Sequence, residues 1–344
     1  MLLQEMAARL GIISKAGLGE ALRNHIPGKV GKLVSGFLVL SAIVVGNAAY
    51  EAGNISGALL GMTYFTLEGS KIFPSVIGLV AFCILFIGNY KIIERFLIAL
   101  VLLMSICFMV TAFLTGPSIV EIMKGLFIPQ LPEGSVLIVI GLIGTTIVPY
   151  NLFLHASLVN EKWQGQSLSA VRWDTLISIG VGGLVSMAII ICAAAVTGRE
   201  VTSAADLSAS LTPFLGDFAG ITISLGLFAA GITSAITAPL AAAYASAGIL
   251  GWNRDLKSFK FRMVWGLILL TGVILSSLGI KPIEIIKFAQ VANGLMLPFI
   301  AIFLLWAVNQ SSIMSNYKNS SLQNVLGFIV ITVCIGLGIY TIMN

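Results

Sequence analysis

Nine long stretches of the chain are almost free of formal charge, and they constrain the fold more than any other feature. A membrane-spanning helix needs about 20 consecutive, mostly apolar residues, and a helix satisfies its own backbone polar groups in lipid. We therefore expect an all-α polytopic membrane protein with about nine full transmembrane helices in a single domain, residues 1–344. The expected spans lie near residues 33–54, 72–90, 96–120, 134–160, 175–198, 218–250, 263–280, 284–308 and 322–343.

The composition supports a membrane protein and excludes several other classes. Of the 344 residues, 58% are hydrophobic and 10% are charged, which is too apolar for a soluble domain of this size. The net charge of +5 does not indicate nucleic-acid binding, because the basic residues lie in short loops between apolar stretches. The four cysteines lie within apolar stretches without metal-ligand spacing, so we expect them to be core residues: Cys83, Cys107, Cys192 and Cys334.

The distribution of basic residues predicts the orientation in the membrane. When Lys and Arg are counted by alternate loops, fourteen of the 19 fall on the side of the N-terminal segment. Cytoplasmic loops carry such an excess, so the N-terminus is expected in the cytoplasm and the C-terminus outside a cytoplasmic membrane. The N-terminal segment has no secretory signal pattern. Residues 1–11 are apolar but too short to span, and we expect them to be the cytoplasmic end of a truncated helix.

The sequence GTTIVPYNLFLH, residues 144–155, interrupts a charge-free stretch with a proline. Pro149 has no N–H to donate to the carbonyl group of Thr145, and its ring clashes with that group. In lipid, a freed carbonyl must find another donor or line a cavity, and secondary transporters offer such carbonyls to cations. Two interpretations stay open here. The break is half of an ion site, or it is a plain proline kink satisfied by the hydroxyls of Thr145 or Thr146.

Ionisable and polar side chains inside the spans are candidates for an ion or proton pathway. Ionisable groups are costly in lipid and are often functional. Glu51 is either a proton or cation site or an interfacial residue near a helix end. His155 is either part of the pathway or a neutral side chain bonded to a neighbouring helix. The full set of pathway candidates is Asn47, Tyr50, Glu51, Tyr150, Asn151, His155 and Asn293.

Spacing places several of these side chains together. In GNAAYEAGN, residues 46–54, intervals of three and four residues put Asn47, Tyr50 and Asn54 on one helical face, and Asn47 also shares a face with Glu51. In QVANG, residues 290–294, Gln290 and Asn293 are three residues apart and carry amide oxygens that can coordinate a cation. The alternative for this pair is hydrogen bonding between helices, which taken alone is the stronger interpretation.

Several motifs of other protein classes are absent from the sequence. It has no Walker-type phosphate loop, no GxSxG or HExxH motif and no paired Cys/His site. ATP-driven transport within this chain is therefore not supported. No catalytic constellation is visible, so we expect neither an enzyme nor a bound cofactor.

Five segments in order resemble the Nramp family of divalent-metal transporters over essentially the whole chain. They are LLQEMAARLGI, GNYKIIERFLIALVLLMSICFMV, KGLFIPQLPEGSVLIVIGLIGTTIVPYNLFLHASLV, GITSAITAPLAAAYASAGIL and FAQVANGLMLPF. The resemblance implies a LeuT-type fold with inverted repeats, whose third to eleventh helices would be the spans above. It also implies secondary active transport of divalent cations, Mn²⁺ or Fe²⁺ by default, with protons as the candidate coupling ion.

The resemblance also implies a metal site, which this sequence alters. The family combines Asp and Asn of a first-helix DPGN motif with a Met-Pro-His motif in the sixth helix. The first helix is not in this sequence, and the second motif reads Val148, Pro149 and Tyr150. The matching positions make Thr145, Val148 and Gln290 the expected metal-site residues, with His155 on the proton side. Loss of the soft thioether weakens discrimination against Mg²⁺ and Ca²⁺, so Mg²⁺ is an alternative substrate.

The third helix departs from the family pattern as well. The family places Asp and, three residues later, Glu along its proton route, whereas this chain has Asn47 and Tyr50. Glu51 is displaced by one position, about 100° around the helix, which puts proton coupling in question. The expected partners are a divalent cation and the lipid bilayer, with no nucleic acid and no obligate protein partner. The alternatives are a non-transporting or truncated Nramp-like membrane protein, or a transporter of a different substrate.

Overall fold

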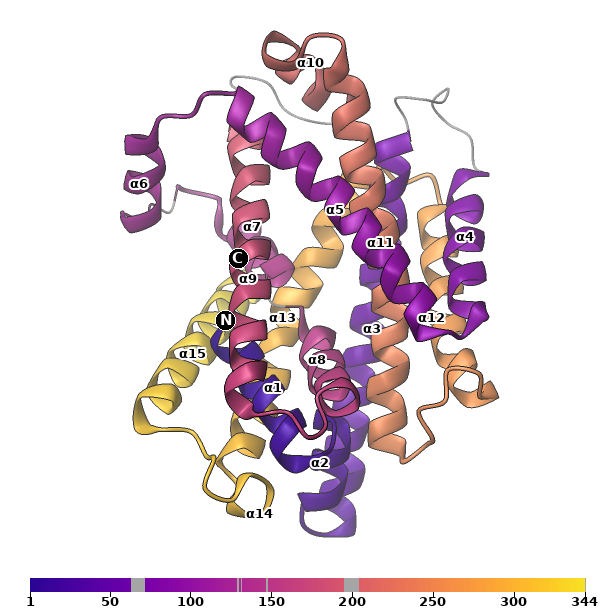
Figure 1. The fold of residues 1–344 in the computed structure, drawn as a ribbon, viewed down its shortest axis with the longest axis vertical. Helices are drawn as coiled ribbons and strands as arrows, with labels where there is room; N and C mark the ends of the chain where they lie inside the picture. Colours follow the sequence, from indigo (N-terminus) through magenta and orange to yellow (C-terminus); the bar gives the residue numbers. More distant parts are fainter. Residues whose placement is uncertain (63–71, 129, 131, 147, 195–203, 344) are drawn as a thin grey trace.

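A computed structural model describes the chain except residues 63–71, 129, 131, 147, 195–203 and 344. Its described residues form helices and no strand (Figure 1). The helices are α1 (Leu2–Ser14), α2 (Leu18–His25), α3 (Lys29–Met62), α4 (Phe73–Ile87), α5 (Tyr90–Leu114), α6 (Ile119–Phe127), α7 (Val136–Thr146), α8 (Pro149–Lys162), α9 (Leu168–Ala194), α10 (Ala204–Leu215), α11 (Phe218–Leu250), α12 (Phe259–Ser276), α13 (Pro282–Asn309), α14 (Ser311–Met314) and α15 (Ser321–Met343).

Seven spans within the described part are long and apolar enough to cross a membrane. They are α3, residues 91–114 of α5, α7 and α8 taken together, α9, α11, α12 and α13. Helix α4 and residues 321–336 of α15 are apolar but shorter. Each expected span overlaps one of these elements, but residue 147 of the span 134–160 and residues 195–198 of the span 175–198 lie outside the described residues. The bounds of the spans and their number, nine, stay predictions.

Local sequence signals explain where several helices begin and end. The side chain of Asn89 accepts a hydrogen bond from the backbone of Lys91 and caps α5, and Ser258 caps α12 in the same way. Gly251 ends α11 with a φ of 72°, a left-handed conformation that glycine adopts without strain. These caps lie in the loops that carry many of the basic residues.

The centre of the bundle is built around α3 and α11, which pack against each other along their lengths. Small residues permit this approach: a Cβ placed on Gly231 of α11 would overlap the backbone of Ala58, and one on Gly61 would overlap that of Phe228. Helices α12 and α13 pack on other sides of α3, and α5 crosses α11 in Figure 1. Helix α7 packs on α13, and α8 packs on α1.

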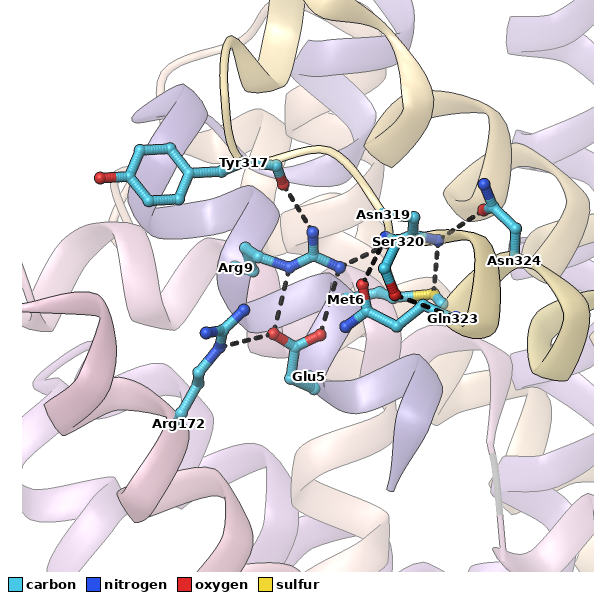
Figure 2. Close-up of polar contacts among 9 residues, drawn as sticks. All are labelled: Glu5, Met6, Arg9, Arg172, Tyr317, Asn319, Ser320, Gln323 and Asn324. Carbon is cyan, nitrogen blue, oxygen red and sulfur yellow. Dashed lines mark hydrogen bonds and ion pairs between the residues drawn. The ribbon is translucent and has the colours of Figure 1, made fainter.

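A charged network joins α1, α9 and the segment before α15 (Figure 2). Arg9 is only 1% exposed, and its guanidinium donates to both carboxylate oxygens of Glu5 at 3.1 and 3.2 Å. It also donates to the Tyr317 carbonyl at 2.6 Å and to the Asn319 side chain at 2.5 Å. Arg172 of α9 reaches the same Glu5 at 2.9 Å. Because a buried charge is costly unless paired, these bonds hold the three elements together.

Candidate functional site

The site begins at an interruption between two helices. Helix α7 ends at Thr146, and α8 begins at Pro149, with Val148 in an extended conformation before it. Proline is favoured at this first helical position because it has no N–H to leave unpaired. The Thr146 hydroxyl donates to the Leu142 carbonyl at 2.8 Å, within its own helix. The helix is therefore interrupted at Val148, and Pro149 cannot donate a hydrogen bond to the Thr145 carbonyl.

Reciprocal glycine contacts bring the end of α7 against α13. A Cβ on Gly144 would collide with the Gln290 carbonyl oxygen and lie 2.7 Å from the Gly294 nitrogen. A Cβ on Gly294 would lie 2.6 Å from the Ile140 carbonyl oxygen. Two backbones can approach this closely only where both helices lack side chains. As a result, Gln290 lies directly beside the last turn of α7.

Two buried tyrosines extend the site from the break into the bundle. Tyr50 of α3 and Tyr150 of α8 are 8% and 3% exposed, and their ring centroids lie 5.5 Å apart. The Tyr50 hydroxyl makes polar contacts with Gln290 and Tyr150, and Tyr150 also contacts Thr237 of α11. The Gln290 Oε1 atom is buried and has no hydrogen-bond partner among the residues that the structure describes. Side chains from α3, α8, α11 and α13 thus meet at one place, and the amide oxygen of Gln290 is left there without a hydrogen bond from the described part of the chain.

Glu51 lies next to this cluster but points toward a different helix. Its side chain is fully buried and packs on Gly272 of α12, where a Cβ would overlap the glutamate stem. One carboxylate oxygen accepts from Asn54 at 3.2 Å, and the other, Oε1, has no partner. Helix α3 continues to Met62, about three turns further. Glu51 therefore does not lie at the end of its helix, and the choice between a proton or cation site and an interfacial residue stays a prediction.

The asparagines near the cluster occupy separate positions around it. Asn47 donates to the Ala238 carbonyl of α11 at 3.3 Å, just before Pro239 in that helix. Asn293 is 1% exposed, and its Nδ2 atom has no partner. Asn151 is half-buried in the first turn of α8. The residues that spacing placed on one face of α3 thus have different partners: Asn47 bonds to α11, Tyr50 contacts Gln290 and Tyr150, and Asn54 bonds to Glu51 of its own helix.

His155 stands apart from the tyrosines, about 7–8 Å further along α8 than Tyr150. It is half-buried, and its Nε2 atom lies 3.4 Å from the Thr175 hydroxyl of α9. It lines a cavity of about 660 Å³ together with Glu94, Asp174 and Lys162. The structure therefore separates the sequence candidates into a buried cluster at the break and a charged cavity further along α8.

The far end of α8 is tied to three other parts of the molecule. Lys162 pairs with Glu94 of α5. Arg254, in the segment after α11, pairs with Glu20 of α2 and lies 3.9 Å from Glu161. The Tyr244 hydroxyl donates to Glu161 at 3.3 Å. These contacts fix the half-helix whose start forms the break.

Sequence reasoning missed some residues of the site. Thr237 contacts Tyr150, and the signal that could have identified it is Pro239, a second proline inside an apolar helix. Asp174 and Glu94 lie near the ends of their helices, where nothing in the sequence links them to His155. No group of three or more His, Cys, Asp or Glu side chains among the described residues could hold a metal ion.

The fold and the interrupted helix define a multi-pass helical membrane protein with a site at the break. The chain belongs to the Nramp family, described as natural resistance-associated macrophage protein-like, whose model matches residues 1–344. It is 28% identical to the divalent metal cation transporter MntH of Klebsiella pneumoniae (strain 342), over 100% of this chain and 83% of that protein. The predicted family is thus confirmed.

The structure is similar to crystal structures of the Eremococcus coleocola manganese transporter. A mutant of that protein gives a TM-score of 0.75 at 20% identity, covering 99% of this chain and 77% of the other. The same transporter in complex with an aromatic bis-isothiourea substituted compound gives 0.74 at 21% identity with the same coverage. This likeness confirms the predicted LeuT-type, all-helical fold. The family consists of transporters, in agreement with the expectation that the chain is not an enzyme.

Proposed function

We propose that this protein is a secondary transporter that moves divalent metal cations through the break between α7 and α8. Two observations carry this proposal. Pro149 cannot donate to the Thr145 carbonyl, and Gln290, whose backbone packs on Gly144 next to Thr145, has a buried Oε1 without a hydrogen-bond partner among the described residues. Discontinuous helices with freed carbonyls are how secondary transporters coordinate cations at the membrane midplane. The family membership and the name of the Klebsiella relative point to the same substrate class.

The donor set favours a hard cation. Thr145 and Gln290 offer oxygen atoms, the side chain of Val148 cannot coordinate, and Tyr50 and Tyr150 add hydroxyls around the site. Hard ions such as Mg²⁺ and Mn²⁺ prefer oxygen ligands and retain several waters, while soft thioether ligands select softer metals. We therefore propose Mn²⁺ or Mg²⁺ as the transported ion, ahead of Fe²⁺ and of thiophilic metals such as Cd²⁺.

Glu51 is the side chain that we propose for coupling. It is a fully buried carboxyl group, and among the described residues the Asn54 amide is its one side-chain hydrogen-bond partner. An isolated buried carboxylate is too costly to persist, so the group carries a proton or binds a cation. Among the described residues, the side chains of Tyr50 and Tyr150 lie close enough to Glu51 to interact with its charge. Protonation of Glu51 would thus be sensed at the break through the two tyrosines.

The basic loops support an orientation in a cytoplasmic membrane with the N-terminus inside. In that orientation the ties between α8, Glu94 and Arg254 lie at the cytoplasmic end of the pathway, and so does the cavity beside His155. Release to the cytoplasm would require α8 to move against these ties. The 344 residues would act as one transmembrane unit, with the bilayer as the only partner that the fold requires.

Uptake by proteoliposomes tests the proposal. Vesicles containing the full chain and an internal fluorescent indicator would be exposed to Mn²⁺ or Mg²⁺, with empty vesicles as the background. We expect saturable uptake that the variant Gln290→Leu weakens about 10- to 100-fold in apparent affinity, the usual loss when one group of a metal site is removed. Gln164→Leu, at an exposed position away from the break, is the matched control. Absence of saturable uptake of either ion would show that the protein does not transport divalent cations.

A further inference from the structure

Helix α6 is an amphipathic helix that the rest of the described molecule leaves uncovered. None of its nine residues is buried, and large apolar side chains such as Ile119 and Phe127 are 76% and 70% exposed. Figure 1 shows α6 set apart from the bundle, at the same end as α10. A helix this short is not stable alone in water. An amphipathic helix of this kind is suited to the boundary between lipid and water.

A groove lies between α6, the end of α5 and the end of α9. Its volume is about 610 Å³, which falls in the range of about 300–1,000 Å³ that ligand pockets span. Leu126, Met187 and Ile190 contribute to its apolar lining, and Thr115, Ser118 and Glu121 are its polar residues. Among the described residues that line the groove, Glu121 is the single charged side chain, and none is Lys or Arg.

The groove is continuous with a surface that faces lipid. Phe113, near the end of α5, is 83% exposed, and Ile190 of α9 lines the groove while remaining 58% exposed. Both belong to spans long and apolar enough to cross a membrane. A hydrocarbon chain can therefore enter the groove sideways from the bilayer without crossing water. A soluble peptide would have to displace lipid to reach the same surface.

We propose that this groove binds one acyl chain of a phospholipid whose headgroup carries an ammonium group. The apolar walls suit the chain, and the Glu121 carboxylate attracts the ammonium group and disfavours purely anionic headgroups. The lipid lies in the leaflet opposite the basic loops. This site is distinct from the break between α7 and α8, and it does not depend on which ion the protein transports.

Quenching of tryptophan fluorescence by brominated lipids tests the proposal. The full chain carrying Ile190→Trp would be placed in equimolar phosphatidylethanolamine and phosphatidylglycerol vesicles, with bromine on the chains of one lipid at a time. The signal is the difference from the parent protein, which has five tryptophans of its own. We expect stronger quenching by brominated phosphatidylethanolamine. One exposed ammonium–carboxylate pair gives a preference of about twofold to fivefold.

Three further variants separate the groove from ordinary lipid contact. The native Leu79 of α4 is 61% exposed, close to the 58% of Ile190. A tryptophan introduced there by Leu79→Trp should be quenched equally by both lipids. Adding Glu121→Gln to Ile190→Trp should remove the preference. Adding Gly125→Leu should remove it too, because a Cβ there meets no protein atom within 4 Å and the larger side chain would fill the groove.

The proposal is overturned by any of three results. Equal quenching of Ile190→Trp by both lipids would mean ordinary annular lipid. No quenching by either would mean that another protein segment or a second copy of the chain covers the groove. A preference that survives both Glu121→Gln and Gly125→Leu would place its source elsewhere. Thermal unfolding of each variant confirms that it is folded, and Gly125→Leu replaces a poor helix former with a good one.

Discussion

Replacing Gly144 with alanine tests whether the close approach of α7 and α13 holds Gln290 at the break. The added Cβ would collide with the Gln290 carbonyl oxygen and lie 2.7 Å from the Gly294 nitrogen. Both are backbone atoms of α13, so no side-chain rotation relieves the overlap. Carbon atoms and their neighbours pack best at about 3.5–4.0 Å, so the two helices must separate by roughly 1 Å.

The consequences for stability and for ion binding differ in size. Overpacking costs about 1–3 kcal/mol, while alanine gains about 1 kcal/mol over glycine in a helix, so the net loss of stability is at most about 2 kcal/mol. Ion binding is more sensitive, because metal–oxygen distances of about 2.0–2.6 Å tolerate little displacement. Moving Gln290 away from Thr145 by that separation should weaken the apparent affinity for Mn²⁺ about 10- to 100-fold.

Gly141→Ala is the matched control, one turn earlier in the same helix. Its Cβ would lie 3.7 Å from the Gln290 Cβ, an ordinary van der Waals contact. It gains the same helix propensity and should leave the affinity unchanged. The assays are the concentration dependence of Mn²⁺ uptake in proteoliposomes and thermal unfolding of the purified variants. Equal apparent affinities for the two variants would refute the argument that this contact positions the ligand.

Three other substitutions give independent predictions. Val148→Met restores a soft ligand beside the break, so Cd²⁺ should compete more strongly with Mn²⁺ in uptake assays; unchanged competition would mean that residue 148 does not face the ion. Glu51→Gln removes the titratable group, so uptake that accelerates with external acidity in the parent should become independent of pH, and a retained pH dependence would assign coupling elsewhere. Arg9→Gln removes the buried guanidinium that bonds Glu5, the Tyr317 carbonyl and Asn319, while Glu5 keeps Arg172, and it should lower the unfolding free energy by about 1–3 kcal/mol. The Arg172 side chain, which pairs with the same Glu5, is 48% exposed, so Arg172→Gln should cost about 1 kcal/mol or less. Equal losses of stability in thermal unfolding of the two variants would contradict this account of Figure 2.

Much of the fold could be predicted from the sequence, because each membrane helix is encoded locally. The absence of charge and the backbone requirement of lipid identify a span without knowledge of its neighbours. The break was also predictable, since Pro149 acts on a group only four residues away. The structure shows Val148 in an extended conformation before α8 and the Thr146 hydroxyl donating to Leu142, and a role of the break in ion binding stays a proposal.

The site was harder to predict, because it depends on which faces of separate helices meet. Spacing placed Asn47, Tyr50 and Asn54 on one face, yet Asn47 bonds to α11 and Asn54 bonds to Glu51. The burial of Glu51 follows from Gly272, a residue more than 200 positions away that leaves room for its side chain. Such pairings are set by packing between helices, and one sequence gives no signal for them.

Direct measurement of Mn²⁺ binding to the purified full chain tests the central claim that the break is a divalent-cation site. Electron paramagnetic resonance distinguishes free Mn²⁺, with its sharp six-line spectrum, from bound Mn²⁺. The account predicts a single saturable site that Mg²⁺ displaces, that Gln290→Leu weakens about 10- to 100-fold and that Gln164→Leu leaves unchanged. Binding that is absent, or equally strong in the Gln290→Leu variant, would contradict it.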